Sequence, residues 1–208
     1  MTAQMNDKFI FHRKGYALSA IEFPDKFLDI YSLGFKPTEF STACWRGYIA
    51  TFSVYKKNLV LKDLYTNNGN DLKNEAPKLN NKLPVISINE KWVKEEIKMK
   101  RREFTYNDIN LLIPYTGSIL IVRDFIRALY VHMGFQSPFK YKTVIQLTFD
   151  NGKLTSTKNI SKIAKLVREN KFKTTERNYD DDISMLKWID DCFDLSYEKK
   201  AKELTDGG

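Results

Sequence analysis

Apolar and polar residues alternate over short stretches in the first two thirds of the chain, a pattern that predicts β-strands joined by turns. Residues 8–12 and 16–21 alternate on either side of a basic turn and predict an opening hairpin. Residues 47–54 and 59–65 alternate more clearly, and the four residues 55–58 join them at hairpin-loop length. We therefore expect a sheet assembled from hairpins of neighbouring strands.

Other segments of this region predict further strands, one loop and two short helices. Residues 118–122 and 143–149 are strand-sized apolar runs. Residues 66–83 contain Asn, Gly and Pro and few large apolar side chains, so they predict a long surface loop. Residues 24–34 begin with proline and end near glycine, as short helices do. Residues 92–102 predict another short helix, because their basic run would lie at its negative C-terminal end.

The last third of the chain carries helical rather than alternating spacing. An apolar stripe at i, i+3, i+4 and i+7 predicts one helix and consists of Ile160, Ile163, Ala164 and Val167. An acidic C-terminal helix is predicted at about 181–203, with a wide apolar face formed by Ile183, Leu186, Ile189 and Phe193. The sequence thus predicts one α+β domain over 1–208, an antiparallel sheet built from hairpins and packed by two C-terminal amphipathic helices.

Composition narrows the class of protein. A chain of 208 residues with 42% hydrophobic and 13% aromatic residues can bury a core without the support of disulfide bonds or metal ions. Cys44 and Cys192 are too few for a disulfide framework, which favours reduced thiols and a cytoplasmic location. No apolar run approaches the roughly 18 residues that span a bilayer, and the first residues do not resemble a secretory signal. We expect no membrane partner.

The net charge of +8 is unevenly distributed along the chain. From residue 180 onward there are nine acidic and four basic residues, so residues 1–179 carry a net charge of +13. A basic body attracts nucleic acid, acidic proteins or anionic surfaces. Residues 153–177 hold eight basic and two acidic residues, a strip suited to phosphate contact. Its predicted contacts are Lys158, Lys162, Lys165, Arg168 and Lys171. An ordinary solvated helix face explains the strip as well and is favoured.

The residue inventory argues against a bound metal or nucleotide cofactor. His12 and His132 are the only histidines, and the chain has no HisXXXHis or CysXXCys pair. It also lacks the glycine patterns that cradle phosphates. We therefore expect no metal and no cofactor.

Two groups of residues are candidates for a site. Cys44 and His132 form a conceivable nucleophile–base pair, with Arg46 beside the thiol, but no local signature supports a hydrolase or transferase. The aromatic stretch 129–141 bends at glycine and proline and predicts either a ligand pocket or a packed corner, of which the corner is favoured. Its candidate binding residues are Tyr130, His132, Phe135 and Tyr141.

Two strings carry a family resemblance. The sequence CWRGYIAT at 44–51 leads into a predicted hairpin, and YVHMGF at 130–135 lies between Tyr115-Thr116-Gly117 and a predicted strand. Together they resemble a group of uncharacterised bacterial proteins with the same order of motifs. The resemblance implies a bacterial or phage-related cytosolic origin and assigns no activity.

Three functions remain open at this point. The first is a non-enzymatic binding protein, such as an immunity or defence-associated accessory factor that engages a protein partner. The second is a nucleic-acid-associated protein that uses the 153–177 strip. The third is a small hydrolase or transferase dependent on Cys44 and His132. The missing catalytic motifs favour the first.

Overall fold

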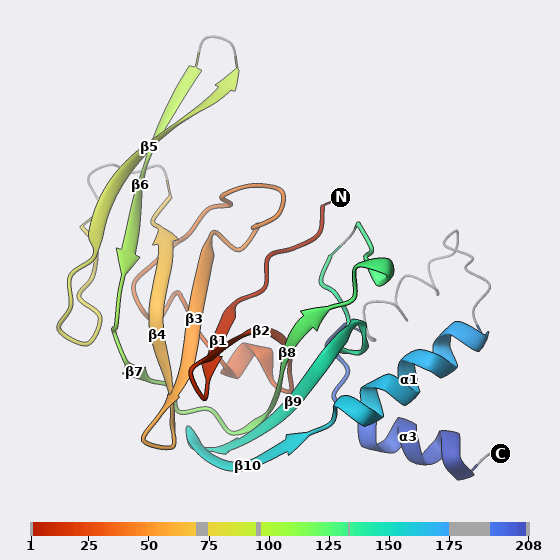
Figure 1. Ribbon diagram of the computed structural model, residues 1–208. Helices are drawn as coiled ribbons and strands as arrows, with labels where there is room; N and C mark the ends of the chain where they lie inside the picture. The colour runs from red at the N-terminus through yellow and green to blue at the C-terminus, as the bar shows by residue number, and fades with distance from the viewer. Residues whose placement is uncertain (1, 70–74, 95–96, 133, 175–191, 207–208) are drawn as a thin grey trace.

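The computed structural model shows a large, strongly curved mixed sheet with helices at one side (Figure 1). It describes residues 2–69, 75–94, 97–132, 134–174 and 192–206, with the backbone alone at 90–94, 97–99 and 171–174. The strands are β1 (Lys8–Phe11), β2 (Lys14–Ile21), β3 (Tyr48–Tyr55), β4 (Asn58–Asn67), β5 (Val85–Lys94), β6 (Ile97–Tyr106), β7 (Leu111–Leu112), β8 (Gly117–Phe125), β9 (Tyr141–Asp150) and β10 (Lys153–Asn159). The helices are α1 (Ser161–Thr174) and α3 (Tyr197–Asp206), with 3-10 turns η1 (Pro24–Lys26), η2 (Arg127–Leu129) and η3 (Pro138–Lys140).

The strand order makes the sheet close on itself at one end. Its path is β10-β9-β8-β2-β1-β3-β4-β6-β5, with β7 beside β4. Strand β10 also returns to β4, where Lys153 pairs with Asn58. The amide of Leu59 donates to the carbonyl of Gly152 at 2.7 Å, which fixes the closure. Seven strands thus form a ring, while β5 and β6 extend outside it (Figure 1).

Both predicted hairpins are confirmed, with turns two residues long. The β1–β2 turn uses His12 and Arg13, at φ 48° and 61°, rather than the later turn that the sequence predicted. The β3–β4 turn uses Lys56 and Lys57, at φ 49° and 67°. Positive φ at both central residues is the signature of type I′ turns, whose twist matches that of the flanking strands.

The predicted helix at 92–102 is wrong, because the described residues of this range belong to the paired strands β5 and β6. Strands β5 and β6 pair from Val85 with Thr105 to Lys94 with Ile97, with a shift of register between Trp92 and Lys94. The basic run therefore lies along β6 rather than at a helix end. The β-branched residues Val85, Ile86 and Ile88 at the start of β5 favour a strand, which the sequence prediction had not included.

The sequence predicted an antiparallel sheet, but the sheet is mixed. Strand β1 pairs with β3 in parallel, with Phe9 opposite Phe52. Strand β10, which was not among the predicted strands, is polar along most of its length. The composition of β10 does not predict a strand, and its antiparallel pairing with β9 accounts for its extended conformation.

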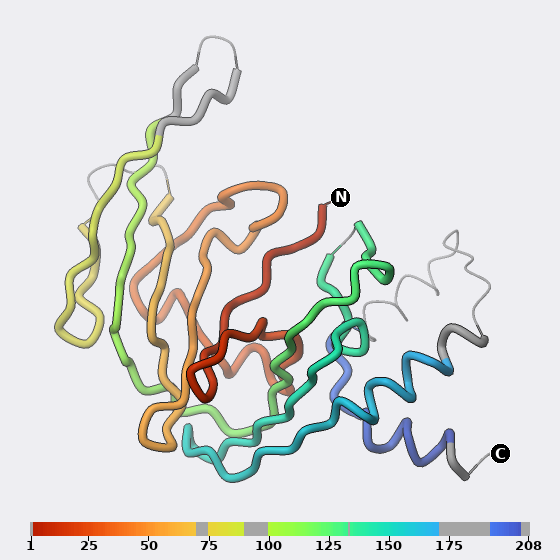
Figure 2. Tube along the Cα trace, viewed as in Figure 1, coloured from red at the N-terminus to blue at the C-terminus, as the bar shows by residue number. Residues whose placement is uncertain are grey.

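The core fills the inside of the ring. Strands contribute fully buried aromatic residues such as Phe9, Phe52 and Phe149. The connection between β2 and β3 adds Phe27 and Phe35, and it holds only the single turn η1 where a helix over 24–34 was predicted. Figure 2 shows this connection crossing behind the strands of the ring. Burial of so many large apolar groups is the main stabilising contribution to the fold.

Strand β8 is buried on both faces. Ile119 and Ile121 belong to the core inside the ring, whereas Leu120 and Val122 belong to a second cluster on its outer face. Alternate side chains of a strand point to opposite faces, so one apolar run serves two layers. Helix α1 covers the second cluster, and its predicted apolar residues Ile160, Ala164 and Val167 are buried there.

The C-terminal helix is only partly as predicted. Residues 181–191 of the predicted helix lie outside the described residues, as do residues 70–74 of the predicted loop. Within the described part, Asp194 interrupts the helix, because its carboxylate accepts hydrogen bonds from the amide and hydroxyl of Ser196. Helix α3 then starts at Tyr197, whose buried hydroxyl accepts a hydrogen bond from the amide of Phe139 at 3.0 Å.

Candidate functional site

Cys44 lies in the core rather than in a reactive position. Its side chain is buried, and its thiol donates to the carbonyl of Tyr48 at 3.4 Å. Burial raises the pKa of the Cys44 thiol, and the nearby Arg46 opposes this shift. A nucleophilic cysteine needs the opposite shift, because the thiolate is the reactive form.

Arg46 makes the most elaborate polar contact of the predicted site residues. Its guanidinium donates two hydrogen bonds to the carboxylate of Asp7, at 2.6 and 3.1 Å, and a third to the carbonyl of Met5. The Asp7 side chain is 8% exposed and the Arg46 side chain 29%. Burial raises the pKa of Asp7, while the charge and hydrogen bonds of Arg46 oppose that rise. This pair ties the first residues of the chain to the loop before β3.

The Asp7–Arg46 pair forms the polar wall of a cavity of about 220 Å³. The face of Tyr48 lies below the guanidinium, 4.8 Å from its central carbon. Most of the remaining lining is apolar: Leu18, Ile21, Pro24, Phe27, Leu28, Phe52, Phe135 and Phe193. Cys44 and His132 do not line this cavity, so it holds no pairing of a nucleophile with a histidine base.

The aromatic residues at 130–141 pack against different parts of the protein. Tyr130 and Tyr141 both pack edge-on against Phe125, at ring distances of 6.3 and 5.0 Å. His132 is exposed, and its Nδ1 lies 3.3 Å from the hydroxyl of Tyr130. Phe135 instead packs against Phe193 beside the cavity. These aromatic contacts are those expected of a packed corner.

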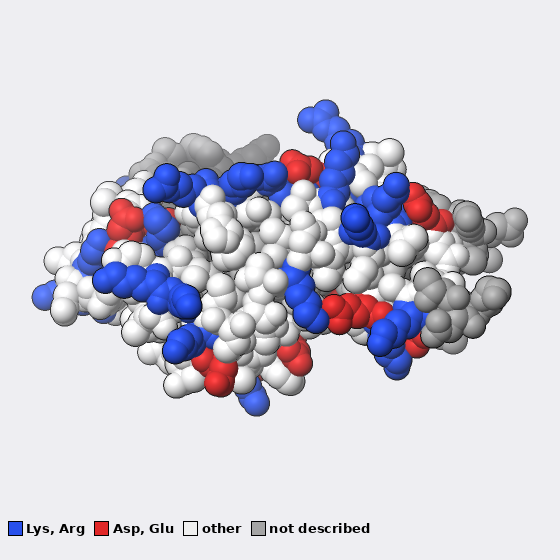
Figure 3. Space-filling view, turned by 60° about the horizontal axis from the view of Figure 1, so that its bottom comes forward, with Lys and Arg blue, Asp and Glu red and all other residues white. Residues whose placement is uncertain are grey.

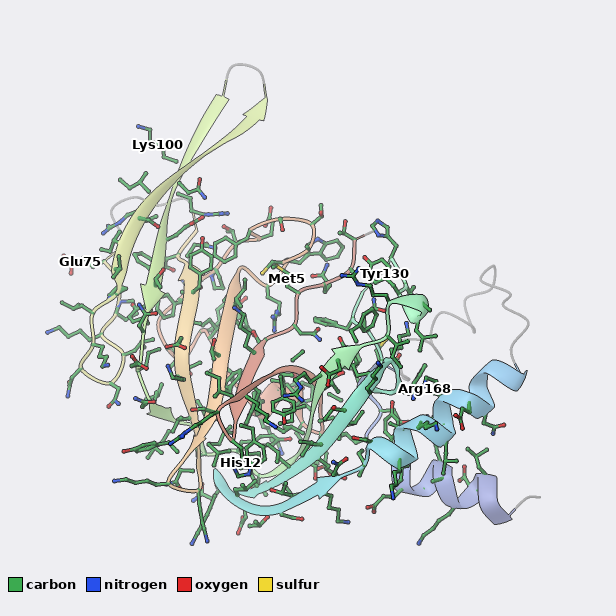
Figure 4. All side chains as sticks on the ribbon, viewed as in Figure 1. Met5, His12, Glu75, Lys100, Tyr130 and Arg168 are labelled. Carbon is green, nitrogen blue, oxygen red and sulfur yellow. The ribbon has the colours of Figure 1, made fainter. Side chains whose placement is uncertain are left out.

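Arg46, His132 and Tyr141 do not converge on one concave surface. Arg46 lines the cavity of about 220 Å³, whereas Tyr141 lines a shallower hollow of about 500 Å³ on the outer face of β1, β2 and β8. His132 lines neither. In Figure 4, Tyr130 marks the loop that carries His132, at the upper side of the molecule.

The predicted basic strip is divided between a strand and a helix. Lys158 lies on β10 and pairs with Glu198 at 3.1 Å, and Lys165 pairs with Glu169 along α1. Arg168 donates to the carbonyls of Phe139 and Tyr141, so it anchors α1 to the sheet. Lys162 is exposed on α1, and the side chain of Lys171 lies outside the described part of the helix. Three of the five predicted contacts are thus engaged within the protein.

Two findings concern metals and membranes. Within the described ranges, no group of three or more His, Cys, Asp and Glu side chains is placed to hold a metal ion. Among the described helices, none is long and apolar enough to cross a membrane.

Several exposed apolar residues lie together on and just before strand β5, which was not predicted from the sequence. Val85 and Ile88 are 66% and 64% exposed, Ile86 is 46% exposed, and Leu83 just before the strand is 66% exposed. Strand β5 ends the sheet, so one of its edges faces no other described strand. The three β-branched residues Val85, Ile86 and Ile88 were the signal available in the sequence.

Comparisons with known proteins add no relative. No family model matches the chain, and neither the curated proteins nor the solved structures contain a match. The resemblance to uncharacterised bacterial proteins therefore stays a prediction from the two strings.

Proposed function

We propose that this protein binds a partner protein, and that an extended, acidic segment of the partner adds to the sheet along the free edge of β5. The observation that supports this proposal is an edge strand of ten residues whose first half exposes Val85, Ile86 and Ile88. An edge strand presents unpaired backbone N–H and C=O groups, which an incoming strand can satisfy.

The other free edge of the sheet supports the choice of β5 by contrast. Strand β10 pairs with β4 only at Lys153, so most of its outer edge is also open among the described strands. Strand β10 is mostly polar and carries Lys153 and Lys158, and its pairing with β9 is irregular between Leu154 and Ser156. Lysines and bulges are the usual means by which proteins protect an edge from pairing. Strand β5 has no charged residue from Val85 to Asn89, and its own charged residues and irregularity lie in its second half.

Charge supports an acidic partner over a second copy of this chain. The chain carries a net charge of +8, so two copies repel each other at long range, whereas an acidic protein is attracted. The paired strand β6 adds Lys100, Arg101 and Arg102 beside β5. An extended acidic segment with alternating apolar residues would satisfy the backbone, the exposed apolar side chains and the charge together.

A matched pair of variants tests the proposal. Ile88→Lys places a charge on β5, and Leu112→Lys makes the same change on β7 at a residue that is equally 64% exposed. Wild-type protein and Leu112→Lys should each retain one acidic protein in stoichiometric amount from cells of the source organism. Ile88→Lys should lose it while unfolding at the same temperature as Leu112→Lys.

Two outcomes would contradict the proposal. One is equal retention of the partner by Ile88→Lys. The other is a concentration-dependent dimer of the purified protein that Ile88→Lys dissociates, because β5 would then serve a second copy of this chain.

A further inference from the structure

Three turns meet at the closed end of the ring, at the bottom of Figure 1. They are the β1–β2 turn at 12–13, the β3–β4 turn at 56–57 and the β9–β10 turn at 151–152. The amide of Leu154 donates to the carbonyl of Lys57 at 2.7 Å, which joins the second turn to the third. The parallel pairing of β1 with β3, with Ile10 opposite Ser53, brings the first turn beside the second. Segments distant in sequence thus form one surface.

This surface is strongly basic. The turns and the residues next to them carry five exposed cations and one exposed acid, Asp150. The cations are Arg13, Lys14, Lys56, Lys57 and Lys153. None of the five forms an ion pair with a described residue. Figure 3 turns this end forward, and more of the surface in that view is blue than red.

Arginine and lysine are unusual residues at the central positions of the two type I′ turns. Type I′ turns favour Asn and Gly, because both central residues have positive φ. Here the central residues are His12 and Arg13 in one turn and Lys56 and Lys57 in the other. Side chains held in a disfavoured backbone region point to a function that needs them there. Figure 4 labels His12, which lies at this end of the ring.

An exposed aromatic ring stands beside the cations. Tyr55 is 55% exposed at the end of β3, and the ammonium of Lys56 lies 5.4 Å from the centre of its ring. Surfaces that bind single-stranded nucleic acid combine cations along the phosphate backbone with aromatic rings on which unpaired bases stack. Duplexes offer no unpaired base to such a ring.

We propose that the closed end of the ring binds single-stranded nucleic acid, with the turn cations on the phosphates and Tyr55 under a base. This surface shares only Lys153 with the predicted 153–177 strip, in which Lys158, Lys165 and Arg168 are engaged within the protein. It also lies apart from β5, so one chain can hold a protein partner and a nucleic acid at once.

The test uses a fluorescent oligothymidylate of twenty nucleotides, with binding measured by anisotropy between 50 and 200 mM salt. Lys56→Asn combined with Lys57→Gly removes two charges and installs the favoured residues of a type I′ turn, so the fold should be at least as stable. We expect binding about tenfold weaker at the lowest salt. The slope of log K against log salt should become shallower by about 1.4, the value for two lost phosphate contacts on a single strand.

Three further arms make the result decisive. Lys162→Ala combined with Lys165→Ala removes the same charge from α1 and should change the affinity less than twofold. Tyr55→Leu should weaken binding without changing the salt slope, because stacking releases no counterions. Vesicles containing phosphatidylserine should bind more weakly than the oligonucleotide. The proposal is overturned if the α1 pair alone reduces binding, if vesicles bind and the oligonucleotide does not, or if nothing binds at 50 mM salt.

Discussion

The carboxylate of Asp7 accepts two hydrogen bonds from the guanidinium of Arg46 and a third from the amide of Ala50, at 2.8 Å. One buried anion therefore holds together the residue before β1, the loop before β3 and β3 itself. Asp7, Arg46 and the β3 residues Tyr48 and Phe52 all line the cavity of about 220 Å³. We expect the arrangement of these segments to depend on the Asp7–Arg46 pair.

Removing one partner of this pair should destabilise the protein strongly. Arg46→Ala leaves the nearly buried Asp7 without its counter-ion, so the free energy of unfolding should fall by about 3 kcal/mol. Asp7→Asn combined with Arg46→Met should recover part of that loss, because no buried charge remains. Urea unfolding measures both. A loss below about 1 kcal/mol for Arg46→Ala would show that the carboxylate finds water or another donor.

The Cys44 thiol should be unreactive in the folded protein. It is buried and its pKa is raised, so a disulfide reagent at pH 8 should label it only after unfolding. Cys192→Ser removes the other thiol and isolates the signal. Labelling of the folded variant within seconds, at the rate of a free thiol, would revive the hypothesis of a cysteine-dependent enzyme.

Stability should fall at alkaline pH through Tyr65. Burial, together with the hydrogen bond that its hydroxyl donates to Glu103, raises the pKa of Tyr65 to about 12. The unfolded chain has a tyrosine pKa of about 10. The contribution of Tyr65 to the free energy of unfolding is therefore fully present below pH 10. It is lost as the pH rises toward 12, because Tyr65 in the unfolded chain releases its proton at lower pH than in the folded protein.

The measurement for Tyr65 is urea unfolding between pH 8 and 11.5. Tyr65→Phe should be about 1 kcal/mol less stable at pH 8 and should lose less stability across the range. Burial also raises the pKa of Tyr106, so both proteins keep part of the slope. Parallel curves for the two proteins would contradict the role of Tyr65.

The parts of the fold that the sequence predicted are the local ones. Alternation around Lys56 and Lys57 was enough to identify a hairpin, and the spacing of Ile160 and Val167 was enough to identify α1. Both patterns depend on residues close in the chain. Strand β6 was missed because four of the five residues at 98–102 are basic, and a basic run is as compatible with the C-terminal end of a helix as with an exposed strand.

The parts that could not be predicted depend on contacts between distant residues. The parallel β1–β3 pair and the meeting of β10 with β4 have no local signature. The basic surface at the closed end follows from that closure, because Arg13, Lys56 and Lys153 are far apart in sequence. The same reasoning explains the predicted Cys44–His132 pair: both residue types were present, and only the fold decides whether they meet.

Hydrogen exchange on strand β5 tests the central claim most directly. The protein should be compared alone and in complex with the acidic partner recovered by wild-type capture. Amides between Val85 and Asn89 should exchange more slowly in the complex, because the added strand accepts their outward N–H groups, while those around Leu112 stay unchanged. Unchanged exchange at 85–89 with protection elsewhere would place the partner on another surface and contradict the account.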